Sequence, residues 1–214
     1  MSGPDSRRTL TLASNLGLAY KEAGRLQDAI SVFERAATGF AATGGIDHPD
    51  TISAVNNAAL AYKDAGRTDE ALPLMEGVAA AREQIQGPEH PDTLTAKSNL
   101  ALLRLESGGQ AADVITIMED ILTERERIQG PDHPLTLMAC NNLAYACSSA
   151  GMNGKAIPLY ERALAGLKRV EGPDHPSTRR VRANLAAVRD SRLLTGLGTR
   201  SLPATPESRE ISQE

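Results

Sequence analysis

Apolar side chains recur along this chain with the spacing of α-helices. In the first stretch, residues 9–23, Leu12, Leu16 and Tyr20 are four residues apart and therefore share one helix face. A second stretch with the same spacing covers residues 26–42, and a glycine separates the two. The pattern predicts a hairpin of two antiparallel helices.

The hairpin pattern is repeated, and a short His-Pro phrase marks each new copy. The four histidines of the chain are 42, 43 and 42 residues apart, and each begins the pattern His-Pro-x-Thr. They are His48, His90, His133 and His175. A fixed period of this length is typical of solenoids, in which each unit buries its apolar face against its neighbours. The one extra residue falls at Gly108-Gly109, in a turn between helices, where it disturbs no packed face.

The repeats cover residues 3–194 and predict an all-α fold, a solenoid of antiparallel helix pairs. Four pairs are followed by a single helix that we expect to end near Leu194. Its arginines, from Arg179 to Arg192, make the outer face polar, as in the capping units of solenoids. Residues 195–214 are rich in Gly, Ser, Thr, Pro and Glu, and we expect them to form a disordered tail.

Each His-Pro phrase predicts the beginning of a helix. Proline suits the first helical position, where its missing N–H would be unpaired in any case. The first copy lacks His-Pro, and Ser6 takes the capping position. Because the histidines are one repeat apart, they cannot converge on a single ion, and we expect no metal site.

Two features of the repeat resemble a known family. Leu16, Gly17 and Tyr20, followed by Ala29 and Phe33, are similar to the tetratricopeptide repeat pattern. The period of 42 residues, together with Gly-Pro-Asp-His-Pro-x-Thr and Asn-Asn-Leu-Ala, resembles the kinesin-light-chain type of this repeat, which is common in bacterial proteins without motor function. The resemblance implies a right-handed solenoid, a bacterial source and a concave groove lined by the first helix of each pair. Arg104 and Cys147 depart from the pattern, because both replace the tyrosine.

The first helices carry the residues that we expect to line this groove. Asparagine can donate and accept hydrogen bonds at once, so a ladder of amides can bind the backbone of an extended peptide, while apolar neighbours accept side chains. In the family that this chain resembles, the repeated asparagine contacts bound peptide. The predicted groove residues are Asn15, Leu18, Asn56, Asn57, Leu60, Asn99, Leu102, Asn141, Asn142, Tyr145 and Asn184. An alternative, compatible with this one, is that the amides bridge neighbouring helices.

Composition and charge exclude several other functions. The formal net charge is −4 with both signs interspersed, so we expect neither nucleic acid nor an anionic membrane as a partner. No apolar run has the roughly 18 residues that span a bilayer, and residues 1–15 lack a signal-peptide core, so we expect a cytoplasmic protein.

Cys140 and Cys147 are too far apart along one helix for a disulfide. The sequence contains no phosphate loop or nucleophile motif, and we expect neither an enzyme nor a cofactor.

The sequence thus favours an interaction module that binds a peptide or protein segment of unknown identity. Two alternatives stay open. The chain could be the sensor or regulatory portion of a larger signalling ATPase, or a scaffold that associates with itself into a homo-oligomer. A clamp for a C-terminal carboxylate is disfavoured, because the groove cations Lys21, Lys63, Lys97 and Arg180 are not clustered on adjacent units.

Overall fold

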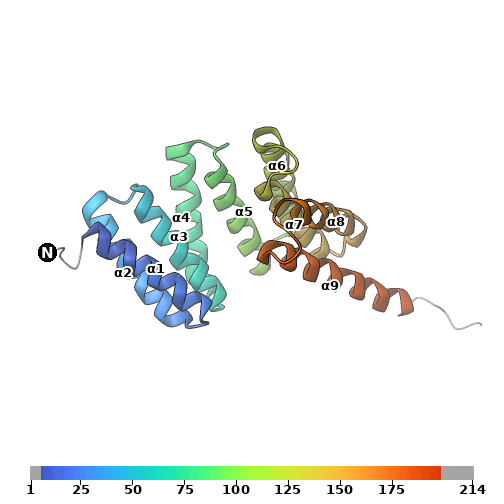
Figure 1. Cartoon of the computed structure of the whole chain (residues 1–214), viewed down its shortest axis with the longest axis horizontal. Helices are drawn as coiled ribbons and strands as arrows, with labels where there is room; N and C mark the ends of the chain where they lie inside the picture. Colours follow the sequence, from blue (N-terminus) through green and yellow to red (C-terminus); the bar gives the residue numbers. More distant parts are fainter. Residues whose placement is uncertain (1–5, 199–214) are drawn as a thin grey trace, which may run out of the picture.

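The chain is an array of α-helices that pack in chain order. The computed structural model describes the backbone of residues 6–198 and the side chains of residues 6–190. Within this range the chain forms nine helices and no strand, with α1 at one end and α9 at the other (Figure 1). The helices are α1 (Arg7–Glu22), α2 (Leu26–Gly44), α3 (Pro49–Asp64), α4 (Thr68–Gln86), α5 (Pro91–Glu106), α6 (Ala111–Gln129), α7 (Pro134–Ser149), α8 (Asn153–Val170) and α9 (Pro176–Gly198). The all-α solenoid predicted from the sequence is confirmed.

Helix α9 is longer than the sequence pattern predicts. It ends at Gly198, so residues 195–198 are helical and not part of the tail. The remainder of the predicted disordered tail, residues 199–214, lies outside the described residues, as do residues 3–5 at the predicted beginning of the array.

The His-Pro phrases form the caps of α3, α5, α7 and α9. In each, the histidine Nδ1 accepts the backbone N–H of the residue two positions later, at 3.1 to 3.3 Å. Proline is the first helical residue, and the glycine three positions before each histidine has a φ of 86° to 93°. At α1, Ser6 Oγ accepts the N–H of Thr9 at 3.3 Å. The capping roles predicted for these residues are confirmed.

Replacing His90 by alanine should lower the free energy of unfolding by about 1 kcal/mol, because the Asp92 N–H loses its acceptor. Urea unfolding followed by circular dichroism measures this change. Replacing His90 by asparagine is the matched control, because its side-chain oxygen can accept the same N–H and should restore most of the stability. Equal losses in both variants would show that the ring packs and does not cap.

The aligned apolar positions of the second helices form the core, but the face of α1 marked by Leu12 and Leu16 does not: these side chains are 61% and 44% exposed, and Leu10, Ala13 and Gly17 are the buried residues of α1. The small residue of each second helix is at most 3% exposed, and the large residue four positions later at most 2%. These residues are Ala29, Ala71, Val114 and Ala156, followed by Phe33, Met75, Met118 and Tyr160. Gly17 of α1 allows close approach, because a Cβ there would lie 2.6 Å from the Phe33 ring. Close packing between helices therefore extends from the first unit to the last.

A repeated glutamate links three of the four second helices to the next first helix. Glu34 Oε1 accepts the Tyr62 hydroxyl at 2.5 Å. One unit later Arg104 replaces the tyrosine and donates to Glu76 at 2.8 Å. At the last interface Arg189 donates to Glu161 at 2.6 Å. The third glutamate, Glu119, pairs instead with Lys155 at 3.6 Å, because Cys147 occupies the aligned position.

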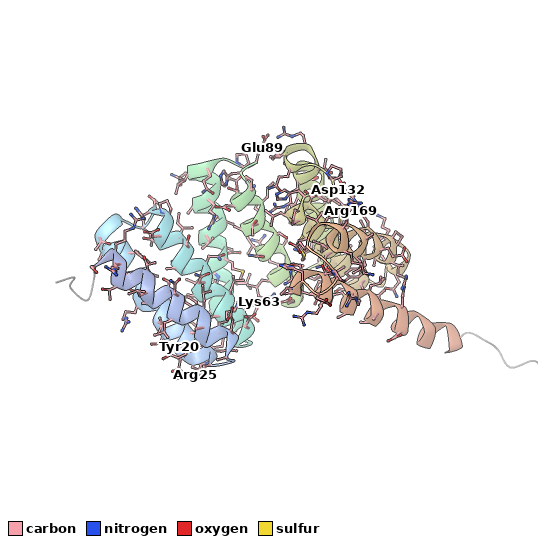
Figure 2. All side chains as sticks on the ribbon, viewed as in Figure 1. Tyr20, Arg25, Lys63, Glu89, Asp132 and Arg169 are labelled. Atoms are coloured by element: carbon pink, nitrogen blue, oxygen red, sulfur yellow. The ribbon has the colours of Figure 1, made fainter. Side chains whose placement is uncertain are left out.

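The turns after α1 and α3 share an arginine–tyrosine contact that the turns after α5 and α7 lack, because Arg104 and Cys147 replace the tyrosine. Arg25, just after α1, lies over the ring of Tyr20 in the last turn of that helix at 4.3 Å, and the two are neighbours in Figure 2. Arg67 covers Tyr62 in the same way at 4.5 Å. The turn after α5 has neither the tyrosine nor an arginine at this place. It is the turn with the extra residue.

The extra residue of the third unit is Gly109. Gly108 has a φ of 85°, like the glycines after α1, α3 and α7, so Gly108 is the aligned residue and Gly109 is the insertion. A Cβ on Gly109 would lie 2.6 Å from the Arg104 carbonyl oxygen, so only glycine fits. The hairpin of α5 and α6 has the smallest helix contact of the four. The insertion therefore coincides with the least closely packed unit.

An arginine at each side holds the beginning of α5. Arg82 of α4 pairs with Asp92 at 2.7 Å. Arg125 of α6 is 3% exposed and donates to the Pro91 carbonyl at 3.1 Å and to the Thr95 hydroxyl at 2.7 Å. Burial lowers the pKa of Arg125 from its ordinary value, and nearby Asp92 opposes that change. Because its guanidinium is hydrogen-bonded, Arg125 can remain charged inside the array.

Candidate functional site

The predicted groove residues all lie on the first helices α1, α3, α5, α7 and α9. We call the surface that they form the first-helix face. Asn15, Leu18 and Tyr145 are exposed, whereas Asn141 is 4% exposed. The others are half-buried: Asn56, Asn57, Leu60, Asn99, Leu102, Asn142 and Asn184. The structure thus leaves most of the predicted side chains accessible, with Asn141 as the exception.

The amides of the first three units lack protein partners. No other described residue hydrogen-bonds the side chains of Asn15, Asn57 or Asn99. None of them is a buried polar group without a partner, so solvent reaches them. Leu60 and Leu102 follow Asn57 and Asn99 by three positions, which places each leucine beside an amide on the same helix face. This part of the first-helix face offers free donors and acceptors beside apolar side chains.

The amides of the last two units form a hydrogen-bonded chain across three helices. Asn184 of α9 donates to Asn141 Oδ1 at 3.0 Å, and Asn141 donates to Asn142 Oδ1 at 3.1 Å. Asn142 then donates to Ser98 Oγ of α5 at 3.1 Å, and Ser98 bonds to the sulfur of Met118 at 3.5 Å. These amides bridge neighbouring helices, which is the alternative that the sequence left open.

Most cations near the first-helix face are already paired. Lys21 lies 3.0 Å from Asp64, and Lys63 lies 3.2 Å from Glu106, so each ion pair joins two successive first helices. Figure 2 shows Lys63 near the middle of the array, away from either end. Lys97 pairs with Glu83 of α4 at 2.8 Å, and Arg180 donates to the Met138 sulfur at 3.6 Å. These four side chains do not converge on one anion site.

The two thiols lie in the core between α6, α7 and α8. Cys140 and Cys147 are free and fully buried. Burial raises the pKa of Cys140 to about 11 and also raises that of Cys147, so both thiols stay protonated at neutral pH.

Among the described residues, no group of three or more His, Cys, Asp or Glu side chains could hold a metal ion. In the same part of the chain, no helix is long and apolar enough to cross a membrane.

The sequence profile of the tetratricopeptide repeat family matches almost the whole array. The matched segments are residues 8–76, 50–113, 108–169 and 141–192. The chain is a tetratricopeptide repeat protein. The second and third matches overlap over residues 108–113, which include the Gly108-Gly109 turn where the repeat is longer by one residue.

Solved structures with a similar fold include repeats of the kinesin-light-chain type. Two crystal structures of nearly identical TPR-like repeats of a putative kinesin light chain from Podospora anserina are 24% identical to this tetratricopeptide repeat chain. One, a point variant, has a TM-score of 0.70 and coverage of 92% of both chains; the other has a TM-score of 0.67 and covers 94% of this chain and 100% of its own. BtubC (BKLC) from P. vanneervenii is 20% identical, with a TM-score of 0.68 over 97% of this chain and 88% of its own. A search of curated proteins found no match.

A further hollow in the described part of this repeat protein lies away from the predicted groove residues. It has a volume of about 980 Å³ and lies between α4 and α6, with α5 as its floor. None of the predicted groove residues lines it. Two signals in the sequence mark the place, the extra glycine after α5 and Arg104 in the position of the tyrosine. Neither signal shows that a hollow forms there.

Proposed function

We propose that the first-helix face binds an extended peptide or protein segment, mainly through the first three units. The supporting observation is the unpartnered pair of amides at Asn57 and Asn99, each with a leucine three positions later. Packed helices lie about 8–10 Å apart, and an extended peptide rises about 3.3 Å per residue. Equivalent amides would therefore meet the peptide backbone about every third residue.

Amide recognition of this kind selects for backbone conformation more than for sequence. An amide can donate to a peptide carbonyl and accept from a peptide N–H at the same time. Leu18, Leu60 and Leu102 provide apolar contact for alternate side chains of the bound segment. Because Lys21 and Lys63 are already paired with carboxylates, a free C-terminal carboxylate is not the main feature recognised. The proposal therefore names an internal, extended and partly apolar segment as the ligand.

The test is selection of binders from a displayed library of random peptides, followed by affinity measurement with the Asn57→Ala/Asn99→Ala double variant. Each lost hydrogen bond weakens binding by about 1 kcal/mol, so the affinity of selected peptides should fall by roughly tenfold or more. Thermal stability should stay unchanged, because neither amide bonds to another described residue.

The matched control is Asn142→Ala. This change removes the bonds to Ser98 and Asn141, so it should lower the melting temperature. If the double variant binds selected peptides as well as the wild type does, the free amides do not recognise peptide. If no extended peptide is selected at all, the proposal as a whole is wrong.

A further inference from the structure

The hollow between α4 and α6 is a trough with an apolar floor. Leu94, Leu100 and Ala101 of α5 form the floor, and Ala80 of α4 and Ile117 of α6 stand on opposite walls. A smaller hollow of about 320 Å³ shares Arg104 and Ile117 with it and continues towards the turn after α5. Together the two hollows are lined on α4 from residue 72 to residue 83, which corresponds to roughly 16 Å, or three helical turns.

The preceding unit has an equivalent trough of smaller volume. Between α2 and α4, the lining residues Glu34, Ala37, Thr38, Ala58 and Leu74 lie one repeat before Glu76, Ala79, Ala80, Leu100 and Ile117. That hollow, of about 360 Å³, adjoins one of about 340 Å³ that shares Val55 and Leu74 with it, and the two together correspond to the single hollow of about 980 Å³ in the third unit. The third unit differs by the inserted Gly109, by the small contact between α5 and α6 and by the loss of the tyrosine. The trough of the third unit is thus one continuous hollow, where the preceding unit has two smaller ones.

Carboxylates outnumber cations around the wide trough. Its lining contains five acidic side chains, Glu76, Glu83, Glu89, Asp120 and Glu124, and two basic ones, Lys97 and Arg104. The two cations are already paired with Glu83 and Glu76. Glu89 and Glu124 share Arg127, and Glu89 lies at the rim near the end of α6 (Figure 2). Asp120 has no ionic partner among the described residues.

The acidic wall belongs to one stripe of α6. Asp113, Ile117, Asp120, Ile121 and Glu124 follow one another at helical spacing and line the two connected hollows. The adjoining stripe of α6, which includes Val114 and Met118, is buried in the core, and so is Ile121 of the trough stripe. Helix α6 therefore presents the half-buried Ile117 and the exposed Asp120 to the trough, beside residues that belong to the core.

The chemistry of the floor distinguishes between possible ligand conformations. An extended peptide needs partners for its backbone N–H and C=O groups, and buried unpaired groups cost about 1–3 kcal/mol each. Leucine, isoleucine and alanine side chains cannot supply these bonds, and the backbone groups of the surrounding helices are already paired within them. A helix satisfies its own backbone, so it can place apolar side chains on this floor without that penalty.

We propose that the trough between α4 and α6 is a second binding site, which takes a short amphipathic helix with lysine or arginine beside its apolar stripe. The stripe contacts Leu100, Ile117 and Ala80, and a basic residue reaches Asp120, the lining carboxylate without an ionic partner among the described residues. Charge complementarity selects a basic helix over an acidic one. The site is separate from the first-helix face and prefers the opposite backbone conformation.

The test uses a capped synthetic peptide of about 16 residues, with leucine at every third or fourth position and lysine on the other faces. Binding of the fluorescently labelled peptide to the full chain is measured by anisotropy at low salt, and a dissociation constant on the order of 10 μM is expected. Ala80→Trp, which fills the trough from an exposed position, should raise this constant at least about tenfold. Asp120→Lys should raise it severalfold.

Matched controls separate the trough from general attraction to an acidic protein. Ala42→Trp places the same ring at an exposed position on α2, and Asp190→Lys makes the same change of charge on α9. Both should leave binding unchanged, as should Asn57→Ala/Asn99→Ala. A peptide of the same composition with scrambled leucines should bind at least about tenfold more weakly. Failure of the patterned peptide to bind, equal binding of the scrambled peptide, or no effect of Ala80→Trp would each overturn the proposal.

Discussion

Replacing Tyr160 by alanine is expected to lower the free energy of unfolding by about 3–5 kcal/mol. Tyr160 of α8 is 1% exposed and lies in the core cluster that holds α6, α7, α8 and α9 together. Burial raises its pKa to about 12, so the hydroxyl is neutral over the whole physiological range and the side chain acts as a packed ring. Truncation would leave a cavity that neighbouring helices can only partly fill.

Urea unfolding monitored by circular dichroism measures this loss, and Tyr145→Ala is the matched control. Tyr145 belongs to the same hairpin but is 37% exposed, so the same truncation should change stability by less than about 1 kcal/mol. Tyr160→Phe keeps the ring and should resemble the wild type more than Tyr160→Ala. Similar losses at Tyr145 and Tyr160 would contradict the burial pattern that defines the core.

Replacing Gly166 by alanine is expected to destabilise the fold by about 1–3 kcal/mol, although alanine favours helices. A Cβ on Gly166 would lie 2.5 Å from a Leu137 methyl group, and Leu137 is only 1% exposed. The α7–α8 pair makes the most extensive helix contact of the array, so neither helix can move away easily. Overpacking should therefore outweigh the gain in helix propensity.

A gain in stability, instead of a loss, is expected for Gly77→Ala on α4. No atom lies within 4 Å of the added Cβ, so this variant should gain about 0.5–1 kcal/mol. A double-mutant cycle gives a second check, because Leu137→Ala removes the clashing methyl groups. The combined loss in Gly166→Ala/Leu137→Ala should be smaller than the sum of the single losses. An additive result would mean that the two side chains do not meet.

The sequence predicts the helices and the core because both depend on local or strictly repeated features. Proline after histidine specifies the first turn of a helix, and the aligned apolar positions recur at each period. The location of the extra residue, in contrast, could only be narrowed to Gly108-Gly109. The left-handed φ of Gly108 identifies Gly109 as the insertion.

The use of each amide could not be predicted, because it depends on the distance between helices that are far apart in sequence. Asn142 reaches Ser98, but the equivalent residues Asn99 and Asn56 form no hydrogen bond with each other, although both can donate and accept. The width of the trough could not be predicted for the same reason, since it depends on the separation of α4 and α6. Pattern analysis identifies the faces of helices but does not measure the gaps between them.

The repeated caps have an evolutionary consequence. Each unit from α3 onwards begins with its own left-handed glycine, histidine cap and proline, so the cap bonds that start a unit come from residues next to its own first helix. Recombination within the segment from this glycine to the proline would exchange whole units and preserve every helix boundary. The compatibility of a new junction would then depend largely on the residue facing the repeated glutamate, which is Tyr62, Arg104, Cys147 or Arg189. The length of the array is thus easier to change by duplication than the internal structure of any one unit.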